Sequence, residues 1–128
     1  MASIFIIGGS EDLMAEVLGE LISRGHDSEQ FRLLNESSFA GEVVTVGEAR
    51  FRVEVATEDA LEDAEVAIFL GDGLLAKEFV ALLAERGSLV IDASPYARRM
   101  GLGTMVVPEV NGELLGAEGR SQLFSLPM

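Results

Sequence analysis

The sequence has no cysteine and a single histidine, and it contains no long apolar run. Without cysteine, disulfides, thiolate metal sites and a cysteine nucleophile are excluded within these residues. His26 has no Ser-His-Asp or metal-ligand spacing around it, so we expect a surface residue. No apolar run approaches the ~20 residues that span a bilayer, and the N-terminus lacks the basic region of a secretory signal. We therefore expect a cytoplasmic location and no membrane partner.

Basic residues are also scarce. Nine Lys and Arg stand against 22 Asp and Glu, which gives a net charge of -13. Such a charge repels phosphate backbones and anionic membranes, so we expect no nucleic-acid partner. The acidic excess is typical of a soluble surface, and an acidic docking face is the alternative.

The 128 residues are enough for one domain, and we assign residues 1–128 to a single one. Two segments have the same order of apolar strand, glycine turn and amphipathic helix. The first is a strand over residues 3–8 with a helix that stops at Gly25, and the second is "EVAIFLGDG" with a helix that stops at Gly87. The inner faces of these helices are predicted to hold Leu13, Val17, Leu18, Leu21 and Ile22, and Leu74, Leu75, Phe79, Leu82 and Leu83.

The remaining segments complete an alternation of strands and helices. We expect short strands at "FRLL", "SLVIDAS" and "TMVVPEV", with "LFSLP" as a further one, and loops at "EVATEDALEDAEV" and "PYARRMGLG". Apolar alternation in "EVVTVGEARFRVEV" indicates an antiparallel hairpin or an edge extension. With right-handed crossovers, this order predicts an α/β fold, a Rossmann-like doubly wound, mostly parallel sheet with helices on both faces.

The first glycine turn has the parts of a nucleotide-binding turn, together with acids. In an intact turn three glycines allow the tight bend, the approach of the diphosphate and close helix packing. Gly8 and Gly9 are present, whereas Glu11 and Met14 stand where the later glycines belong. Ser10 can cap the helix, and an acid there is favourable by ~0.3–1 kcal/mol. A diphosphate would displace these side chains and meet like charge, so we predict weak or absent dinucleotide binding.

Two further places carry candidate site residues. Asp72 lies between Gly71 and Gly73, where either a ligand contact or a plain glycine hinge fits the pattern. Arg98 and Arg99 could hold a phosphate or carboxylate bidentately, or make surface ion pairs.

No catalytic residue or metal ligand is predicted. Asp92 ends an apolar strand, and we expect it to bond to nearby loop amides. No combination of nucleophile, base and oxyanion donors can be assembled from these residues.

From Ile4 to about Asn111 the chain resembles the N-terminal, cofactor-binding domain of aspartate-semialdehyde dehydrogenases. The landmarks are "IIGG" with its helix, "FRLLNESSFAGE", "VAIFLGDGLLAKEF", "LVIDASPYARRM" and "MVVPEVN". Enzymes of that family use NADP, a catalytic cysteine and inorganic phosphate to interconvert aspartate semialdehyde and its acyl phosphate. The resemblance implies cofactor contacts at Gly8, Gly9, Ser10, Leu13, Gly71 and Gly73, and a phosphate-binding role for Arg98.

The chain departs from the family pattern at several of these positions. The family's Gly-Ala-Thr-Gly turn falls on residues 8–11, so Glu11 replaces its second glycine and Met14 its third. The Ala-Ser-x-Arg-Ser stretch that holds the adenosine 2'-phosphate falls on residues 35–39, where its arginine is Ser38 and Glu36 is an added acid. The family's Ser-Ala-Gly-Gly turn acquires Asp72, and the asparagine after Asp92 becomes alanine.

We therefore expect a degenerate dinucleotide-binding domain without catalytic activity by itself, closest to the non-catalytic USG-1-like branch. By resemblance the cofactor is NADP or NAD, and neither is expected to bind tightly. The family's catalytic cysteine would follow these residues, so we expect the catalytic and dimerisation domain to be absent and a homo-oligomer to form through the face that this domain covers. The alternatives are the cofactor half of an active NAD(P)-dependent enzyme and an acidic protein-interaction module.

Overall fold

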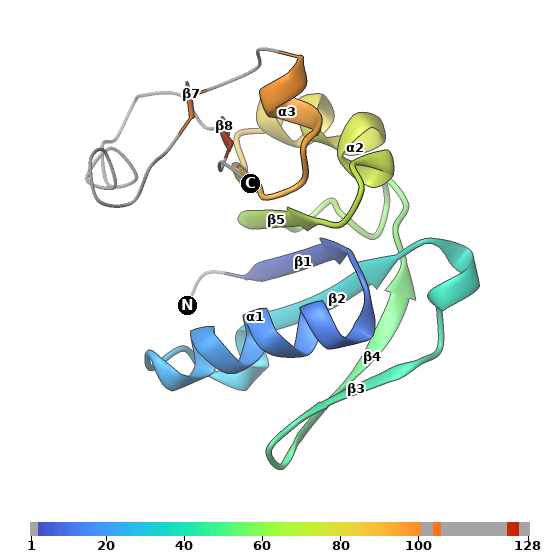
Figure 1. The fold of residues 1–128 in the computed structure, drawn as a ribbon, viewed down its shortest axis with the longest axis vertical. Coiled ribbons are helices and arrows are strands. Elements are labelled where there is room, and N and C mark those ends of the chain that lie inside the picture. The colour runs from blue at the N-terminus through green and yellow to red at the C-terminus, as the bar shows by residue number, and fades with distance from the viewer. Residues whose placement is uncertain (1–2, 101–103, 106–122, 126–128) are drawn as a thin grey trace.

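The computed structural model describes residues 3–100, 104–105 and 123–125, and in this part of the chain eight strands form one sheet. The order across the sheet is β3-β4-β2-β1-β5-β6-β8-β7 (Figure 1). The strands are β1 (Ile4–Gly8), β2 (Phe31–Asn35), β3 (Val43–Val46), β4 (Ala49–Val55), β5 (Val66–Leu70), β6 (Leu89–Asp92), β7 (Thr104–Met105) and β8 (Leu123–Ser125). The helices are α1 (Glu11–Ser23), α2 (Leu74–Glu85) and α3 (Tyr96–Arg99), with short 3-10 turns η1 (Ser28–Gln30) and η2 (Ser37–Phe39).

Every strand pair is parallel except that of β3 and β4. From β1 the chain moves to β2 and β4 on one side, and then crosses to β5 and β6 on the other. The order reverses between β1 and β5, which is the place where doubly wound sheets bind their ligands. The predicted fold class is confirmed, and the predicted hairpin is β3 with β4.

Apolar clusters lie on both faces of the sheet. One cluster joins α1 to the sheet through Met14 and Leu18, which pack with Ile4, Ile6 and other strand residues. The other joins α2 through Phe79, Val80 and Leu83, which pack with Phe5, Ile7 and Phe69. Because β1 contributes alternate residues to both clusters, it is buried on both faces, as predicted for a central parallel strand.

Two predicted inner-face residues are exposed instead. Leu13 is 36% exposed, and Met14 takes the buried position in the first turn of α1. Leu74 is 59% exposed because α2 begins there and its buried stripe runs through Ala76, Phe79, Val80 and Leu83. In both helices the predicted helical period is correct, but one residue that was predicted to face the sheet is exposed.

The loop predicted at "PYARRMGLG" is wrong at its start, where α3 forms. The buried carboxylate of Asp92 accepts from the N–H of Ala97 over 2.8 Å and from the N–H and hydroxyl of Ser94. These bonds satisfy amides at the start of the turn and allow a helix to begin. Of the strand predicted at "TMVVPEV", only Thr104–Met105 falls within the described residues, and it is a strand.

Candidate functional site

A pocket of about 250 Å³ lies at the carboxyl ends of β1, β2 and β5. Figure 1 shows these ends on one side of the sheet, next to η2 and the start of α2. Its lining consists of Gly8, Gly9, Ser10, Asn35, Glu36, Phe39, Leu70, Gly71, Asp72, Leu74 and Leu75. The pocket therefore occupies the crevice where an open α/β sheet takes a nucleotide.

One glycine in each turn, Gly8 and Gly71, is required by contact with neighbouring backbone. Gly8 has φ of 90°, and a Cβ on it would lie 2.7 Å from the carbonyl oxygen of Leu70. Gly71 also has φ of 90°, and its Cβ would lie 2.9 Å from the backbone nitrogen of Gly9. The two turns pack so closely that side chains at these positions would collide. The turn itself thus explains these glycines, with or without a ligand.

The amino terminus of α1 is only partly occupied by its own side chains. The hydroxyl of Ser10 accepts from the N–H of Leu13 over 3.1 Å, which confirms the predicted cap. Glu11 and Asp12 are exposed and do not line the pocket, so neither carboxylate fills the space above the turn. The acids act on this site through their charge near the helix end rather than by obstruction.

Met14 stands where the family turn has its third glycine, and it is buried with 1% of its surface exposed. It belongs to the apolar cluster between α1 and the sheet. A glycine at this position lets a helix approach its strand, and the methionine instead fills the space between them. Met14 therefore affects the site through the spacing between α1 and the sheet.

Asn35 links the end of β2 to the first glycine turn. Its side-chain amide donates to the carbonyl oxygen of Gly9 over 2.8 Å, and its Oδ1 accepts from the N–H of Glu36 over 2.8 Å. With 4% of its surface exposed, Asn35 is one of few buried polar residues in the described part of the chain. This amide holds the segment after β2 against the turn after β1.

The pocket lining is acidic. It includes Glu36 and Asp72, and no Lys or Arg is among the described residues that line it. Oδ1 of Asp72 accepts from the N–H of Leu74, the first residue of α2, over 3.0 Å, and the N-cap itself is Gly73. A phosphate group here would meet carboxylates without a compensating cation from the described residues of the lining.

Two predicted site residues lie elsewhere. Leu13 is not among the residues that line this pocket. Gly73, which has φ of 99°, faces a second pocket of about 360 Å³ beside α3, with Lys77, Arg99 and Met100 in its lining. Gly8, Gly9, Ser10 and Gly71 are the predicted residues that the structure brings together around the first pocket.

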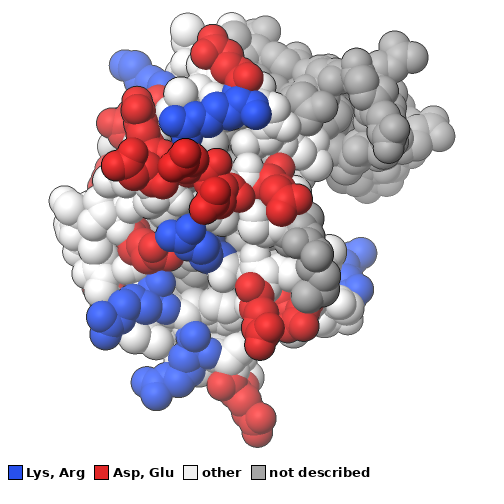
Figure 2. All heavy atoms as spheres, turned by 180° about the vertical axis from the view of Figure 1, so that it is seen from behind, with Lys and Arg blue, Asp and Glu red and all other residues white. Residues whose placement is uncertain are grey.

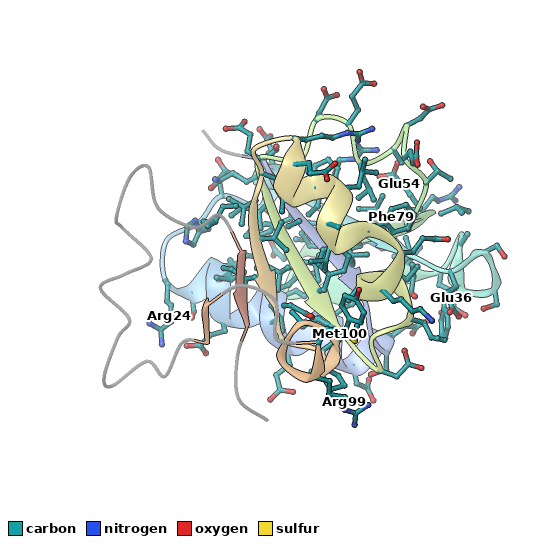
Figure 3. All side chains as sticks on the ribbon, turned by 90° about the horizontal axis from the view of Figure 1, so that it is seen from above. Arg24, Glu36, Glu54, Phe79, Arg99 and Met100 are labelled. Atoms are coloured by element: carbon teal, nitrogen blue, oxygen red, sulfur yellow. The ribbon has the colours of Figure 1, made fainter. Side chains whose placement is uncertain are left out.

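The predicted phosphate-binding residue, Arg98, lies in α3, and its side chain is outside the described part of the structure. Figure 3 shows the neighbouring Arg99 extending outward from α3, well separated from Glu36 on the segment after β2. Asp92 fixes the start of this helix through the amide of Ala97, as predicted for a structural acid. The role of Arg98 remains a prediction.

No group of three or more His, Asp or Glu side chains is placed to hold a metal ion within residues 3–100, 104–105 and 123–125. His26 is exposed, as predicted, and its ring meets the edge of Phe31 at 6.3 Å between centroids.

Asn35 and Phe39 were not among the predicted site residues, although the resemblance placed the 2'-phosphate stretch on residues 35–39. Asn35 ends β2, which pairs with β1 next to the first glycine turn, and Phe39 lies in η2 just after it. The contact of Asn35 with Gly9 crosses 26 positions of sequence, and no local pattern shows it.

The strand order, the paired glycine turns and the pocket at the switch point define a dinucleotide-binding domain of Rossmann type. The sequence profile of the semialdehyde dehydrogenase NAD-binding domain matches residues 3–117. The chain belongs to that family.

Relatives of the chain include full-length enzymes. Aspartate-semialdehyde dehydrogenase of Bacillus subtilis is 26% identical over 108 residues, which cover 84% of this chain and 31% of the relative. The enzyme of Corynebacterium glutamicum is 27% identical over 114 residues, covering 87% and 33%. The crystal structure of aspartate semialdehyde dehydrogenase II from Vibrio cholerae superposes with a TM-score of 0.77 at 26% identity, over 98% of this chain and 37% of that one. The chain thus spans about a third of the length of these curated relatives.

Proposed function

We propose that this chain is a dinucleotide-binding domain whose site has lost most of its affinity for NADP, and that it has no catalytic activity by itself. The observation that carries the proposal is the lining of the pocket, which among the described residues has two acidic residues and no basic one. This loss supports an assignment to the non-catalytic USG-1-like branch of the family.

The 2'-phosphate of NADP is the part that this pocket opposes most strongly. A phosphate monoester carries about -1.5 to -2 charges at neutral pH and is usually bound by arginine or lysine. By the resemblance, the family's arginine falls on Ser38, which is exposed and neutral here, and Glu36 lines the pocket two residues earlier. Charge and hydrogen-bonding capacity are therefore both unfavourable for that phosphate.

The proposal is tested by restoring the family's groups. The double variant Glu36→Ser with Ser38→Arg should bind NADP at least about tenfold more tightly than the unaltered chain in titration calorimetry, because it removes one repulsion and adds one bidentate donor. The matched control is Glu48→Ser, which removes an exposed acid in the β3–β4 turn outside the pocket and leaves Arg50 unchanged. An unaltered chain that already binds NADP at micromolar levels would overturn the proposal.

A second candidate is the cofactor half of an active NAD(P)-dependent aspartate-semialdehyde dehydrogenase. It is favoured by the retained Gly8 and Gly71 of the two turns and by the absence of Glu11 and Asp12 from the pocket lining. Its substrate, its reaction and a phosphate-binding role for Arg98 come from the relatives and the resemblance alone.

We also propose that the chain forms a homo-oligomer and that its location is cytoplasmic. Leu74 and Met100 are 59% and 61% exposed beside the second pocket, which supports a homo-oligomer through this face. An association that is weakened by Leu74→Ser in light scattering would support it, and a monomer at millimolar concentration would contradict it. No helix in the described part of the chain has the length and apolarity to cross a membrane.

An acidic protein-interaction module is the remaining alternative. Figure 2 shows a broad band of acidic side chains across the face turned away from the viewer of Figure 1, with basic side chains beside it. Specific capture of a protein by this domain, without any effect of nucleotide, would favour this alternative.

A further inference from the structure

We infer that the pocket at the switch point selects an adenine dinucleotide with a free ribose 2'-hydroxyl, NAD over NADP, and that Glu36 makes this selection. The inference rests on the proposed function in one respect, namely that this pocket is the dinucleotide site. It adds a ligand preference opposite to that of the NADP-dependent enzymes that the chain resembles.

The position of Glu36 in the fold is the first argument. It directly follows Asn35, the last residue of β2, and β2 pairs in parallel with β1, which leads into the first glycine turn. In doubly wound sheets the adenosine ribose lies over the end of this second strand, where a carboxylate accepts hydrogen bonds from its hydroxyl groups. Glu36 is partly buried and lines the same pocket as Gly8 and Gly9.

The backbone of Glu36 is held relative to the glycine turn. Asn35 accepts from its N–H over 2.8 Å and at the same time donates to the carbonyl oxygen of Gly9 over 2.8 Å. The carbonyl oxygen of Glu36 accepts from the N–H of Phe39 over 2.9 Å. Since a buried amide bonds to both segments, the distance between the acid and the diphosphate end of the site is set by the fold.

The carboxylate of Glu36 has no partner of its own among the described residues. It makes no side-chain cap on η2, and no salt bridge in the described ranges includes it. Glu54 and Glu20, by contrast, bond to Arg32 and Arg24. The acceptor oxygens of Glu36 are therefore available to ligand hydroxyl groups at the pocket wall.

NAD and NADP differ in how their adenosine ribose would interact with Glu36 at the pocket wall. A ribose with both hydroxyl groups free can donate to the carboxylate, and such bonds to a charged acceptor are among the stronger ones. A 2'-phosphate replaces one donor with about two negative charges, and the described residues of the pocket lining offer no cation to balance them. Phe39, Leu70 and Leu75 supply apolar surface in the same pocket for the base.

The test compares NAD and NADP by titration calorimetry at low salt, with the unaltered chain and with Glu36→Gln. The unaltered chain should bind NAD at least about tenfold more tightly than NADP. Glu36→Gln should weaken NAD and strengthen NADP, so that the ratio of the two dissociation constants moves toward NADP by at least about tenfold. Glu48→Gln, an exposed acid in the β3–β4 turn, should leave the ratio unchanged, and thermal melts should show that all three proteins are folded.

The outcomes separate this inference from the proposed function. Equal or tighter binding of NADP by the unaltered chain overturns the inference while the pocket remains a dinucleotide site. An unchanged ratio in Glu36→Gln overturns the role of Glu36. Failure of both nucleotides to bind also overturns the inference and leaves the proposed loss of affinity standing.

Discussion

Single residues in the glycine turns are constrained by neighbouring backbone. Gly8 and Gly87 both have φ of 90°, yet only Gly8 has atoms within 4 Å of an added Cβ, the nearest being the carbonyl oxygen of Leu70 at 2.7 Å. The pair therefore separates the cost of the backbone conformation from the cost of a collision. At both positions glycine is favoured because φ is positive, and at Gly8 a side chain would in addition collide with Leu70.

We expect Gly8→Ala to destabilise the fold by roughly 3 kcal/mol, and Gly87→Ala by about 1 kcal/mol. The difference arises because Gly8→Ala must push the β1 and β5 turns apart. Urea unfolding of the two variants and the unaltered chain measures it. Equal losses of stability in the two variants would contradict this prediction, because they would show that the β1 and β5 turns move apart without a cost in free energy.

Some residue roles could be predicted from the sequence and others could not. The cap by Ser10 and the structural bonds of Asp92 depend on neighbours within a few positions, and both predictions are confirmed. The contact between Asn35 and Gly9 depends on which strands are adjacent, so it needs the fold. The exposure of Leu13 likewise depends on how α1 rotates to bury Met14.

At the scale of elements, α3 depends on one buried acid. Asp92 is fully buried, and its two carboxylate oxygens accept from Ser94 and from Ala97 at the start of the helix. Helix periodicity could not predict four residues of helix in "YARR". The helix forms because the strand before it ends in an acceptor for its free amides.

We expect Asp92→Ala to lower the free energy of unfolding by about 3 kcal/mol, because buried amide donors lose a charged acceptor. Asp72→Ala, which removes an exposed acceptor for the first amide of α2, should cost about 1 kcal/mol. Urea unfolding gives both values, and hydrogen exchange at the amide of Ala97 reports on α3 itself. A normal exchange rate there in Asp92→Ala would contradict the capping role.

The pairing of β2 and β4 includes an ion pair across the strands. The side chain of Arg32 bonds to Glu54 through two nitrogens, at 2.9 and 2.6 Å, and lies 4.8 Å from the ring centroid of Phe5. Hydrogen bonding from Arg32 lowers the pKa of Glu54 below its usual 4.5, and burial opposes the shift in part. Both side chains are about 40% exposed, so solvent screens the pair.

This pair predicts a small dependence of stability on pH. Because the folded pKa of Glu54 is lowered, its contribution is present above the unfolded pKa and is lost as the pH falls through the folded value. Glu54→Gln should therefore cost less than about 1 kcal/mol at neutral pH, and the difference should shrink below pH 4.5. Urea unfolding of both proteins over this range is the measurement. A difference that grows in acid would contradict the assignment.

At the scale of the whole molecule, the fold class was the part of the fold most accessible from sequence. Two strand-turn-helix units and the hairpin predicted a doubly wound sheet with helices on both faces, and the structure has this arrangement. The pocket was less accessible, because its wall comes from three separate strand ends. The net charge of -13 acts on the same site, since it adds to the repulsion of an anionic cofactor.

Titration calorimetry of the unaltered chain with NADP at low salt tests the central claim most directly. With two acidic residues and no basic one among the described residues of the pocket lining, we predict a dissociation constant of ~1 mM or weaker and an unshifted melting temperature. Binding at micromolar levels, accompanied by a higher melting temperature, would contradict the account and restore an intact NADP site.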